Sequence, residues 1–304
     1  MTSTLSYPYA RSRLMRTVYI RLKDDEKHRN SKHTYWYEID LNRIPDDLHL
    51  KFYQLYQDDE TEEFLEICYE KADWIFTQIW NALARSLLSW FMSNTSINGY
   101  LKRGSMFVYS QAQFQKLLGI DDFWLSENLI DLGAGDGMVT KKMASHFKNV
   151  FVTEVSHQMQ YRLAENGFTV IDIESWANGH LIYDVISCLN LLDRCNYPLN
   201  ILKQIKATLR PETGRLVVAL VLPFSAYVEE NSVDHKPAEK LGIQGNTFED
   251  QTTDIINNVF KPLGFELVTF SRVPYLSEGD LSTSFYVLHD AIFVLKVANN
   301  TTQS

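Results

Sequence analysis

A short apolar run that leads directly into a glycine-rich turn is the feature that most constrains this fold. Residues 129–137 read Leu-Ile-Asp-Leu-Gly-Ala-Gly-Asp-Gly, and the apolar part is typical of a buried parallel strand. The glycines that follow let the backbone turn tightly and approach a ligand without a Cβ in the way. A helix expected over Val139 to Phe147 would direct its free N–H groups back at that ligand.

The spacing within this turn indicates which ligand it takes. Dinucleotide-binding folds use Gly-x-Gly-x-x-Gly, in which a helix N-terminus holds a pyrophosphate. Here the pattern is Asp131-x-Gly133-x-Gly135-x-Gly137, and Asp136 adds a second acid that would repel a pyrophosphate. The pattern resembles motif I of class I S-adenosylmethionine (SAM) methyltransferases. By that resemblance Asp131, Gly133 and Gly135 belong to the cofactor site.

Two later strand ends add polar groups to the same edge. Glu154 ends the β-rich run from Phe151 and lies 21 positions after Gly133, where an acid can accept both ribose hydroxyls of a nucleoside. A solvated carboxylate at a strand end is the alternative for Glu154 taken alone. A further strand expected over 184–189 leads to Asn190, at the carboxyl edge where open α/β sheets bind ligands.

Alternation of strand and helix patterns after residue 128 predicts an α/β fold. The resemblance to methyltransferases implies a Rossmann-like sheet of seven strands, with the last strand inserted antiparallel. We expect a helix at 198–209 and strands at 128–132, 150–155, 168–172, 184–189, 214–222, 265–273 and 285–297.

Four regions are predicted along the chain. Residues 1–33 are interpreted as a loose N-terminal arm, 34–127 as a helical cap, 128–298 as the methyltransferase domain and 299–304 as a tail. The cap includes an amphipathic helix at 74–92 rather than a membrane span. Within the domain, the polar segment 223–250 is long enough to be a substrate loop, with flexible filler as the alternative.

Composition excludes several classes of protein. With 304 residues, of which 45% are hydrophobic and 13% aromatic, the chain can build a core and is not disordered. A net charge of −9 argues against nucleic-acid binding and suits cationic or histidine-rich partners. Neither the eight histidines nor the three cysteines form a spaced metal cluster or a disulfide framework. We expect a monomer without a metal ion.

The first residues bear on localisation. Four arginines precede the first acid, Asp24, and no sustained apolar segment accompanies them, so no secretory signal is apparent. The sequence favours an intracellular protein, cytoplasmic by default. Mitochondrial or endoplasmic-reticulum association is the alternative.

One string narrows the resemblance to a family. Cys188-Leu-Asn-Leu-Leu-Asp-Arg-Cys195 resembles the DREV family of protein-histidine N-pros methyltransferases. Further matching strings are Thr95-Ser-Ile-Asn-Gly, Arg103-Gly-Ser-Met-Phe-Val, Leu220-Val-Leu-Pro-Phe, Pro274-Tyr-Leu and Tyr286-Val-Leu. The resemblance runs from about 60 to 297, whereas residues 1–40 depart from it. It implies methyl transfer from SAM to Nδ1 of histidine in His-x-His motifs flanked by small residues, with S-adenosylhomocysteine as the product.

The resemblance also implies roles for individual side chains. Asn190 would touch the cofactor, Tyr275 would contact both cofactor and substrate, and Asp193 and Tyr286 would face the target imidazole. The alternatives are that Asp193 pairs with Arg194 or caps the next helix, and that both tyrosines are half-buried strand residues. Arg103 would bind the cofactor carboxylate or form a surface ion pair.

Two other functions remain open on the sequence. One is SAM-dependent methylation of a small molecule or of another protein nucleophile. The other is a non-catalytic SAM-binding partner protein. The intact set of Asp131, the three glycines and Glu154 argues against the second of these.

Overall fold

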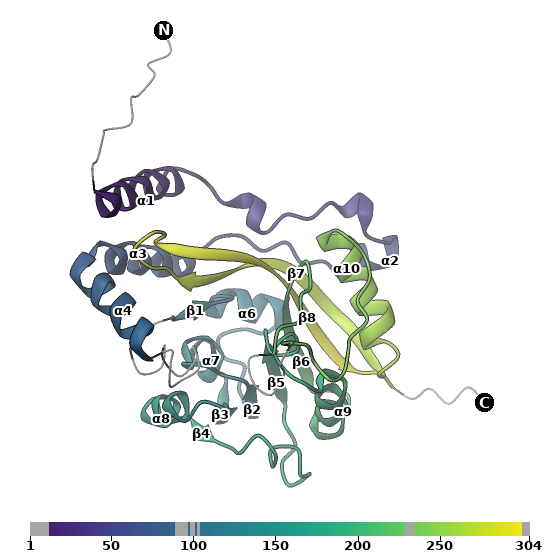
Figure 1. Ribbon diagram of the computed structural model, residues 1–304. Helices are drawn as coiled ribbons and strands as arrows, with labels where there is room; N and C mark the ends of the chain where they lie inside the picture. The colour runs from purple at the N-terminus through teal and green to yellow at the C-terminus, as the bar shows by residue number, and fades with distance from the viewer. Residues whose placement is uncertain (1–11, 89–96, 98–100, 102–103, 229–233, 300–304) are drawn as a thin grey trace.

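A sheet of eight strands runs through the described part of the molecule, residues 12–88, 97, 101, 104–228 and 234–299 of a computed structural model (Figure 1). Its order is β1-β7-β8-β6-β5-β2-β3-β4. The strands are β1 (Met106–Phe107), β2 (Ser126–Leu132), β3 (Phe147–Thr153), β4 (Thr169–Val170), β5 (Val185–Leu189), β6 (Arg215–Val221), β7 (Phe265–Glu278) and β8 (Phe285–Val297).

The pairing confirms the predicted α/β class and adds one strand. Strands β4, β3, β2, β5 and β6 pair in parallel, while β8 lies antiparallel between β6 and β7. The eighth strand, β1, comes from the region predicted as a helical cap and pairs antiparallel with the end of β7. This short strand covers the edge of β7 at Leu276 and Ser277, and an isolated bridge from Phe52 covers it at Phe270. Covered edges of this kind are less prone to pairing with other chains.

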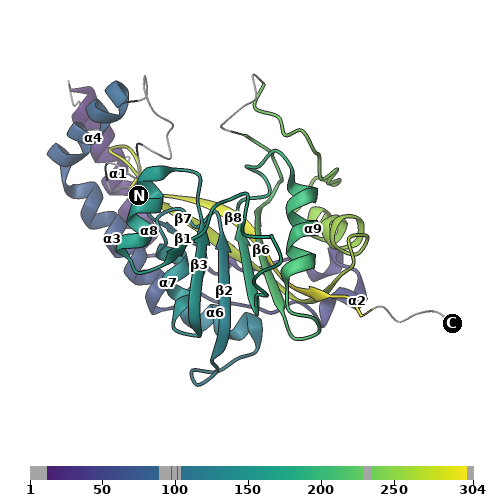
Figure 2. The same ribbon diagram turned by 90° about the horizontal axis from the view of Figure 1, so that it is seen from below.

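Helices cover both faces of the sheet (Figure 2). One face packs against α3, α6 and α7, and the other packs against α9, α10 and the π-helical turn that continues α10. The helices are α1 (Arg13–Arg29), α2 (Asp46–His49), α3 (Asp59–Asp73), α4 (Ile75–Leu88), α6 (Gln111–Leu118), α7 (Met138–Ala144), α8 (His157–Glu165), α9 (Pro198–Thr208) and α10 (Phe248–Asp254), with the π-helical turn at Ile255–Phe260.

Several predicted boundaries shift. The helix expected to reach Phe147 ends at Ala144, because Phe147 already pairs with Ser126 as the first residue of β3. Strand β4 has two residues, and the side chain of Asp172 then accepts a hydrogen bond from the Glu174 amide at 2.7 Å in a turn. The predicted substrate loop 223–250 overlaps α10, whose first turn is capped by the Thr247 side chain.

The expectation of a loose arm over residues 1–33 is corrected for its described part. Residues 13–29 form α1, and Arg21 is only 1% exposed. Arg21 donates to the Ala72 carbonyl and, at 2.7 Å, to Asp73 Oδ1 at the end of α3. The sequence did not reveal this helix because its docking depends on buried charge rather than on an apolar stripe. Residues 1–11 lie outside the description.

The region 34–127 is likewise less helical than predicted. Trp36 and Leu55 belong to the core on one face of the sheet, whereas Leu48 packs into the core on the other. Between them, Phe270 of β7 donates its N–H to Lys51. This part of the chain therefore passes around the β7 edge (Figure 1). No helix within the described ranges has the length and apolar character needed to cross a bilayer.

Candidate active site

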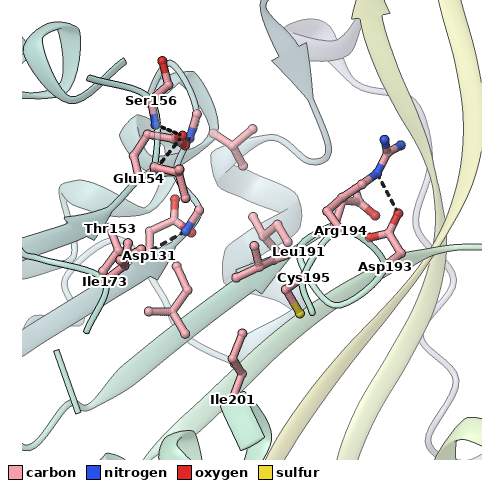
Figure 3. A pocket seen from close by; sticks show the side chains of 18 of the residues that line it. Asp131, Thr153, Glu154, Ser156, Ile173, Leu191, Asp193, Arg194, Cys195 and Ile201 are labelled. Atoms are coloured by element: carbon pink, nitrogen blue, oxygen red, sulfur yellow. Dashed lines mark hydrogen bonds and ion pairs between the residues drawn. The ribbon is translucent and has the colours of Figure 1, made fainter. Parts of the chain in front are cut away.

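A cavity of about 1080 Å³ opens at the carboxyl ends of β2, β3, β5 and β6. The glycine turn after β2 and the end of β3 line one side (Figure 3). The loop after β5, including Asp193, lines the other side. Asn190 and Tyr275 of β7 line the same cavity. The volume matches the upper end of small-molecule pockets, about 300–1,000 Å³.

Asp131 holds this edge of the sheet together. Its side chain accepts hydrogen bonds from Thr140 of α7, at 2.6 Å, and from Ser187 of β5. Burial raises its pKa to about 6, against the lowering effect of these two hydroxyls. Because each carboxylate oxygen already has a donor from the protein, we interpret Asp131 chiefly as a support for the turn.

The three glycines meet different demands. All have positive φ values, 72° at Gly133, 56° at Gly135 and 79° at Gly137, where L-residues with a Cβ are disfavoured. A Cβ at Gly135 would meet nothing within 4 Å, whereas at Gly137 it would lie 2.8 Å from Leu163 and 2.9 Å from Phe168. Gly135 therefore leaves space at the cavity, and Gly137 permits α7 to pack against its neighbours.

Glu154 is fixed by backbone donors at the tip of β3. Its Oε2 accepts from Gly135 N–H at 3.0 Å, and its Oε1 accepts from the amides of Val155 and Ser156 at 2.9 and 3.0 Å (Figure 3). The residue is 9% exposed and lines the cavity. Because a carboxylate oxygen can accept two hydrogen bonds, Oε2 retains capacity for a ribose hydroxyl.

Asn190 turns the chain at the end of β5. Its φ of 52° is left-handed, a region that Asn tolerates better than most residues. Its N–H donates to Ala219 at 3.0 Å, and Nδ2 donates to Asp290 Oδ2 at 2.7 Å. Its Oδ1 is buried without a hydrogen-bond partner among the described residues, which points to a missing donor.

Asp193 lies three residues further along, on the cavity wall. It is 4% exposed, and Arg194 Nε donates to its Oδ2 at 3.1 Å, so the pairing considered as an alternative is present (Figure 3). Its Oδ1 is buried and has no partner among the described residues. Burial raises the pKa of this carboxyl, and the nearby Arg194 opposes that shift.

The segment predicted as a substrate loop forms part of this wall. Tyr227 donates its N–H to the Asp193 carbonyl at 2.8 Å, and Val228 lines the cavity. The Tyr227 ring stacks on His235 with centroids 4.5 Å apart. The Glu239 carboxylate accepts from two amides at the start of α9. The described parts of the segment are thus tied to the site; residues 229–233 lie outside the description.

Tyr275 and Tyr286, both predicted to belong to the site, lie in different environments. Tyr275 lines the cavity and its hydroxyl contacts Met106 Sδ of β1; burial raises its pKa. Tyr286 is not among the residues that line the cavity; its side chain is 46% exposed and its hydroxyl donates to Asp280 at 3.0 Å. The structure therefore does not bring Tyr286 to the centre where Asp193 lies.

Asp290 is a residue that the sequence analysis missed. It is fully buried on β8 and bonds to Asn190, directly behind the cavity wall. A lone acid within the apolar run 285–297 was the available signal, because an unpaired buried carboxylate is rare. Arg103, predicted to bind the cofactor carboxylate or to form a surface ion pair, lies outside the described residues. Most of the string 95–99 also lies outside them.

Comparison with known proteins identifies the family. The sequence model of the DREV methyltransferase family matches residues 36–297. The chain belongs to the DREV methyltransferase family. This membership supports methyltransferase activity and agrees with the topology of the sheet. Within the described ranges, no group of three or more His, Cys, Asp or Glu side chains could hold a metal ion.

Solved structures show weaker likeness. A precorrin-6y C5,15-methyltransferase from Geobacter metallireducens is 14% identical with a TM-score of 0.37, covering 61% of this chain and 86% of its own. A ribosomal protein L11 methylase from Lactobacillus delbrueckii subsp. bulgaricus is 13% identical with a TM-score of 0.34, covering 57% and 70%. A precorrin 8w decarboxylase from Methanobacterium thermoautotrophicum is 13% identical with a TM-score of 0.38, covering 61% and 88%.

Proposed function

We propose that this DREV-family member transfers a methyl group from SAM to Nδ1 of histidine in His-x-His motifs of protein substrates. The observation that carries the proposal is the buried Asp193 carboxylate on the cavity wall, whose Oδ1 lacks a hydrogen-bond donor. An unsatisfied buried acceptor at a ligand cavity indicates a donor that arrives with the substrate.

The residues of the opposite wall suit SAM. Glu154 would accept from the ribose hydroxyls, the open space at Gly135 would admit the amino-acid portion, and Asn190 would contact the cofactor from the β5 side. SAM bound there would supply an electrophilic methyl group on a sulfonium. The protein's own contribution is then to orient the nucleophile.

Asp193 suits the tautomer problem that histidine poses. Neutral imidazole, with a pKa near 6.5, is a nucleophile at neutral pH, but only the nitrogen without a proton can attack. By accepting a hydrogen bond from Nε2–H, Asp193 would keep the lone pair on Nδ1. The same carboxylate would stabilise the positive charge that develops on the ring.

The β7–β8 ribbon offers a path for the rest of the peptide. Tyr275 is directly opposite Leu288, and Ser277 is opposite Tyr286, so these side chains share one face of the ribbon. Leu288 and Tyr286 are each 46% exposed. A bound peptide would run from the cavity across these two side chains.

A labelling experiment tests the function. The protein is incubated with methyl-labelled SAM and a His-x-His peptide, and the labelled nitrogen is identified by NMR. We expect label at Nδ1, and none in a matched peptide whose two histidines are replaced by alanine. Label confined to small molecules or other nucleophiles would favour the second reading of the sequence. Binding of S-adenosylhomocysteine without any transfer would favour a non-catalytic partner.

Asp193→Asn tests the residue that carries the proposal. The amide keeps the size of the side chain but removes the charge, so we expect retained S-adenosylhomocysteine binding and turnover lowered by about 10²-fold or more. Calorimetry and peptide kinetics measure the two quantities. Glu127→Gln, at an exposed site paired with Lys148, is the control and leaves both unchanged. Undiminished turnover in Asp193→Asn would remove Asp193 from the mechanism.

A further inference from the structure

Asn190 and Asp290 form a buried pair directly behind the cavity wall, and one oxygen of each side chain lacks a hydrogen-bond partner among the described residues. Nδ2 of Asn190 donates to Oδ2 of Asp290 at 2.7 Å. The other oxygen of each side chain, Oδ1 in both cases, is buried without a partner among the described residues. An amide oxygen and an ionised carboxylate oxygen are both acceptors only, so neither can satisfy the other.

We propose that Asp290 is a positioning residue that works as a neutral carboxylic acid, closing a ring of two hydrogen bonds with the side-chain amide of Asn190. A single proton on Oδ1 of Asp290, donated to Oδ1 of Asn190, gives both orphaned oxygens a partner. The inference deepens the proposed function, on which it rests only in naming the cofactor as what Asn190 contacts.

The surroundings of Asp290 favour the neutral form. It is fully buried on β8, and its neighbours in register are Val221 of β6 and Val273 of β7. An isolated ionised carboxylate in such a place is very costly. No ion pair of Asp290 is found within the described ranges, which include all of β6, β7 and β8.

The charges near Asp290 act in the same direction. Asp193, on the loop after β5, disfavours a second negative charge, and burial together with Asp193 raises the pKa of Asp290 to about 8. Tyr275 of β7 also interacts with it, and burial keeps that phenol protonated. On β8 itself, His289 is the adjacent residue, and burial and Arg272 lower its pKa.

The ring would serve the site in two ways. It would hold Asn190 in its left-handed conformation while leaving the second amide hydrogen for a ligand. A neutral Asp290 would also avoid a second negative charge beside Asp193, whose own charge is needed to stabilise the positive charge that develops on the imidazole.

Two substitutions test whether Asp290 acts as a neutral carboxylic acid or as a carboxylate. In Asp290→Asn, the new amide can donate to Asn190 Oδ1 and accept from Nδ2, so the ring survives at every pH. We expect S-adenosylhomocysteine affinity within about threefold of wild type at pH 7. We also expect the weakening of binding above about pH 8, which wild type should show, to disappear. In Asp290→Leu the ring cannot form, and affinity should fall about tenfold or more.

Carbon-13 NMR of labelled aspartate side chains provides a readout that needs neither variant activity nor a substrate. The Asp290 carboxyl, assigned by its absence in Asp290→Asn, should be protonated at pH 7 and titrate well above the other aspartates. If that variant does not fold, a carboxyl titrating near pH 8 in wild type carries the same conclusion.

The inference fails if the NMR signal is that of a carboxylate at pH 7, or if folded Asp290→Asn loses as much affinity as Asp290→Leu. The first result would mean that Asp290 is ionised at neutral pH, and the second that the amide cannot replace the acid in holding Asn190. Failure of the proposed function is distinguishable: histidine peptides would remain unmethylated while the NMR titration and the pH profile of binding stayed as described.

Discussion

The carboxyl groups around the cavity differ in what their oxygens meet. Both oxygens of Asp131 accept from protein hydroxyls, and those of Glu154 accept from backbone amides. Asp193 and Asp290 each keep one buried oxygen without a partner among the described residues. A buried acceptor left unsatisfied costs about 1–3 kcal/mol. We therefore expect both Asp193 and Asp290 to acquire a donor, Asp193 from the substrate and Asp290 by binding a proton.

Tyr286→Ala tests whether this residue contacts peptide rather than the reacting ring. Because Tyr286 lies outside the cavity lining on the exposed face of β8, we expect KM for a His-x-His peptide to rise about threefold to tenfold with kcat nearly unchanged. Steady-state kinetics over a range of peptide concentrations measures both. A fall of kcat by 10²-fold would restore the catalytic role implied by the family resemblance.

The pH dependence of stability follows from the raised pKa of Asp290. The folded protein binds this proton more tightly than the unfolded chain. The stabilisation is therefore complete below the unfolded pKa, near 3.8, and is lost as pH rises through about 8. Asp290→Asn lacks this loss. We expect its Tm relative to wild type to increase between pH 5 and pH 9, measured by thermal unfolding; a constant difference would contradict the assignment. Asp131 titrates in both proteins, so its contribution cancels in the Tm difference.

At the scale of elements, the glycine turn also allows α7 to pack against its neighbours. Gly137 is the residue before this helix, and a Cβ there would press on Leu163 of α8 and on Phe168. The turn therefore serves packing at Gly137 and leaves space for a ligand at Gly135, while a Cβ at Gly133 would lie 3.1 Å from Leu191. The same sequence pattern satisfies both needs.

Gly137→Ala should destabilise the fold more than a glycine replaced in open space. We expect a loss of about 3 kcal/mol, which combines left-handed strain with overpacking. The control is Gly167→Ala, where φ is 84° but no atom lies within 4 Å, and strain alone predicts about 1 kcal/mol. Urea unfolding measures both. Equal losses would show that the contacts with Leu163 and Phe168 relax freely.

At the scale of the whole molecule, the N-terminal part is built into the fold. Helix α1 docks on α3 through Arg21, and its Asp25 accepts from Ser284 next to β8 at 2.8 Å. Residues 34–56 then pass around the β7 edge and contribute to both cores. The sheet, the cap and α1 are thus connected through the β7–β8 ribbon (Figure 1).

Arg21→Ala should loosen this connection. The substitution leaves the buried Ala72 carbonyl without its donor, at a cost of about 1–3 kcal/mol, and removes the ion pair with the exposed Asp73 carboxylate. We expect a Tm lower by roughly 2–8 °C and faster proteolysis within residues 12–33. The control, Lys23→Ala, removes only an exposed pair with Glu26 and should change neither. Unaltered proteolysis would show that α1 is held by its other contacts.

The sequence by itself determined the strand–turn–helix at 126–144, the alternating strands that follow and the positions of Glu154 and Asn190 at strand ends. These features depend on local periodicity, on glycine and on the rule that parallel strands end at one edge. Local patterns survive because neighbouring residues must satisfy the same backbone hydrogen bonds.

Only the tertiary structure decided which polar groups meet. Asp290 lies 100 positions from Asn190, Arg21 lies 52 positions from Asp73, and Tyr286 points to the hairpin turn rather than to the cavity. No local periodicity encodes such pairs, because they depend on how distant strands and helices pack. Burial then sets the charge of each carboxyl, and burial is a property of the assembled molecule.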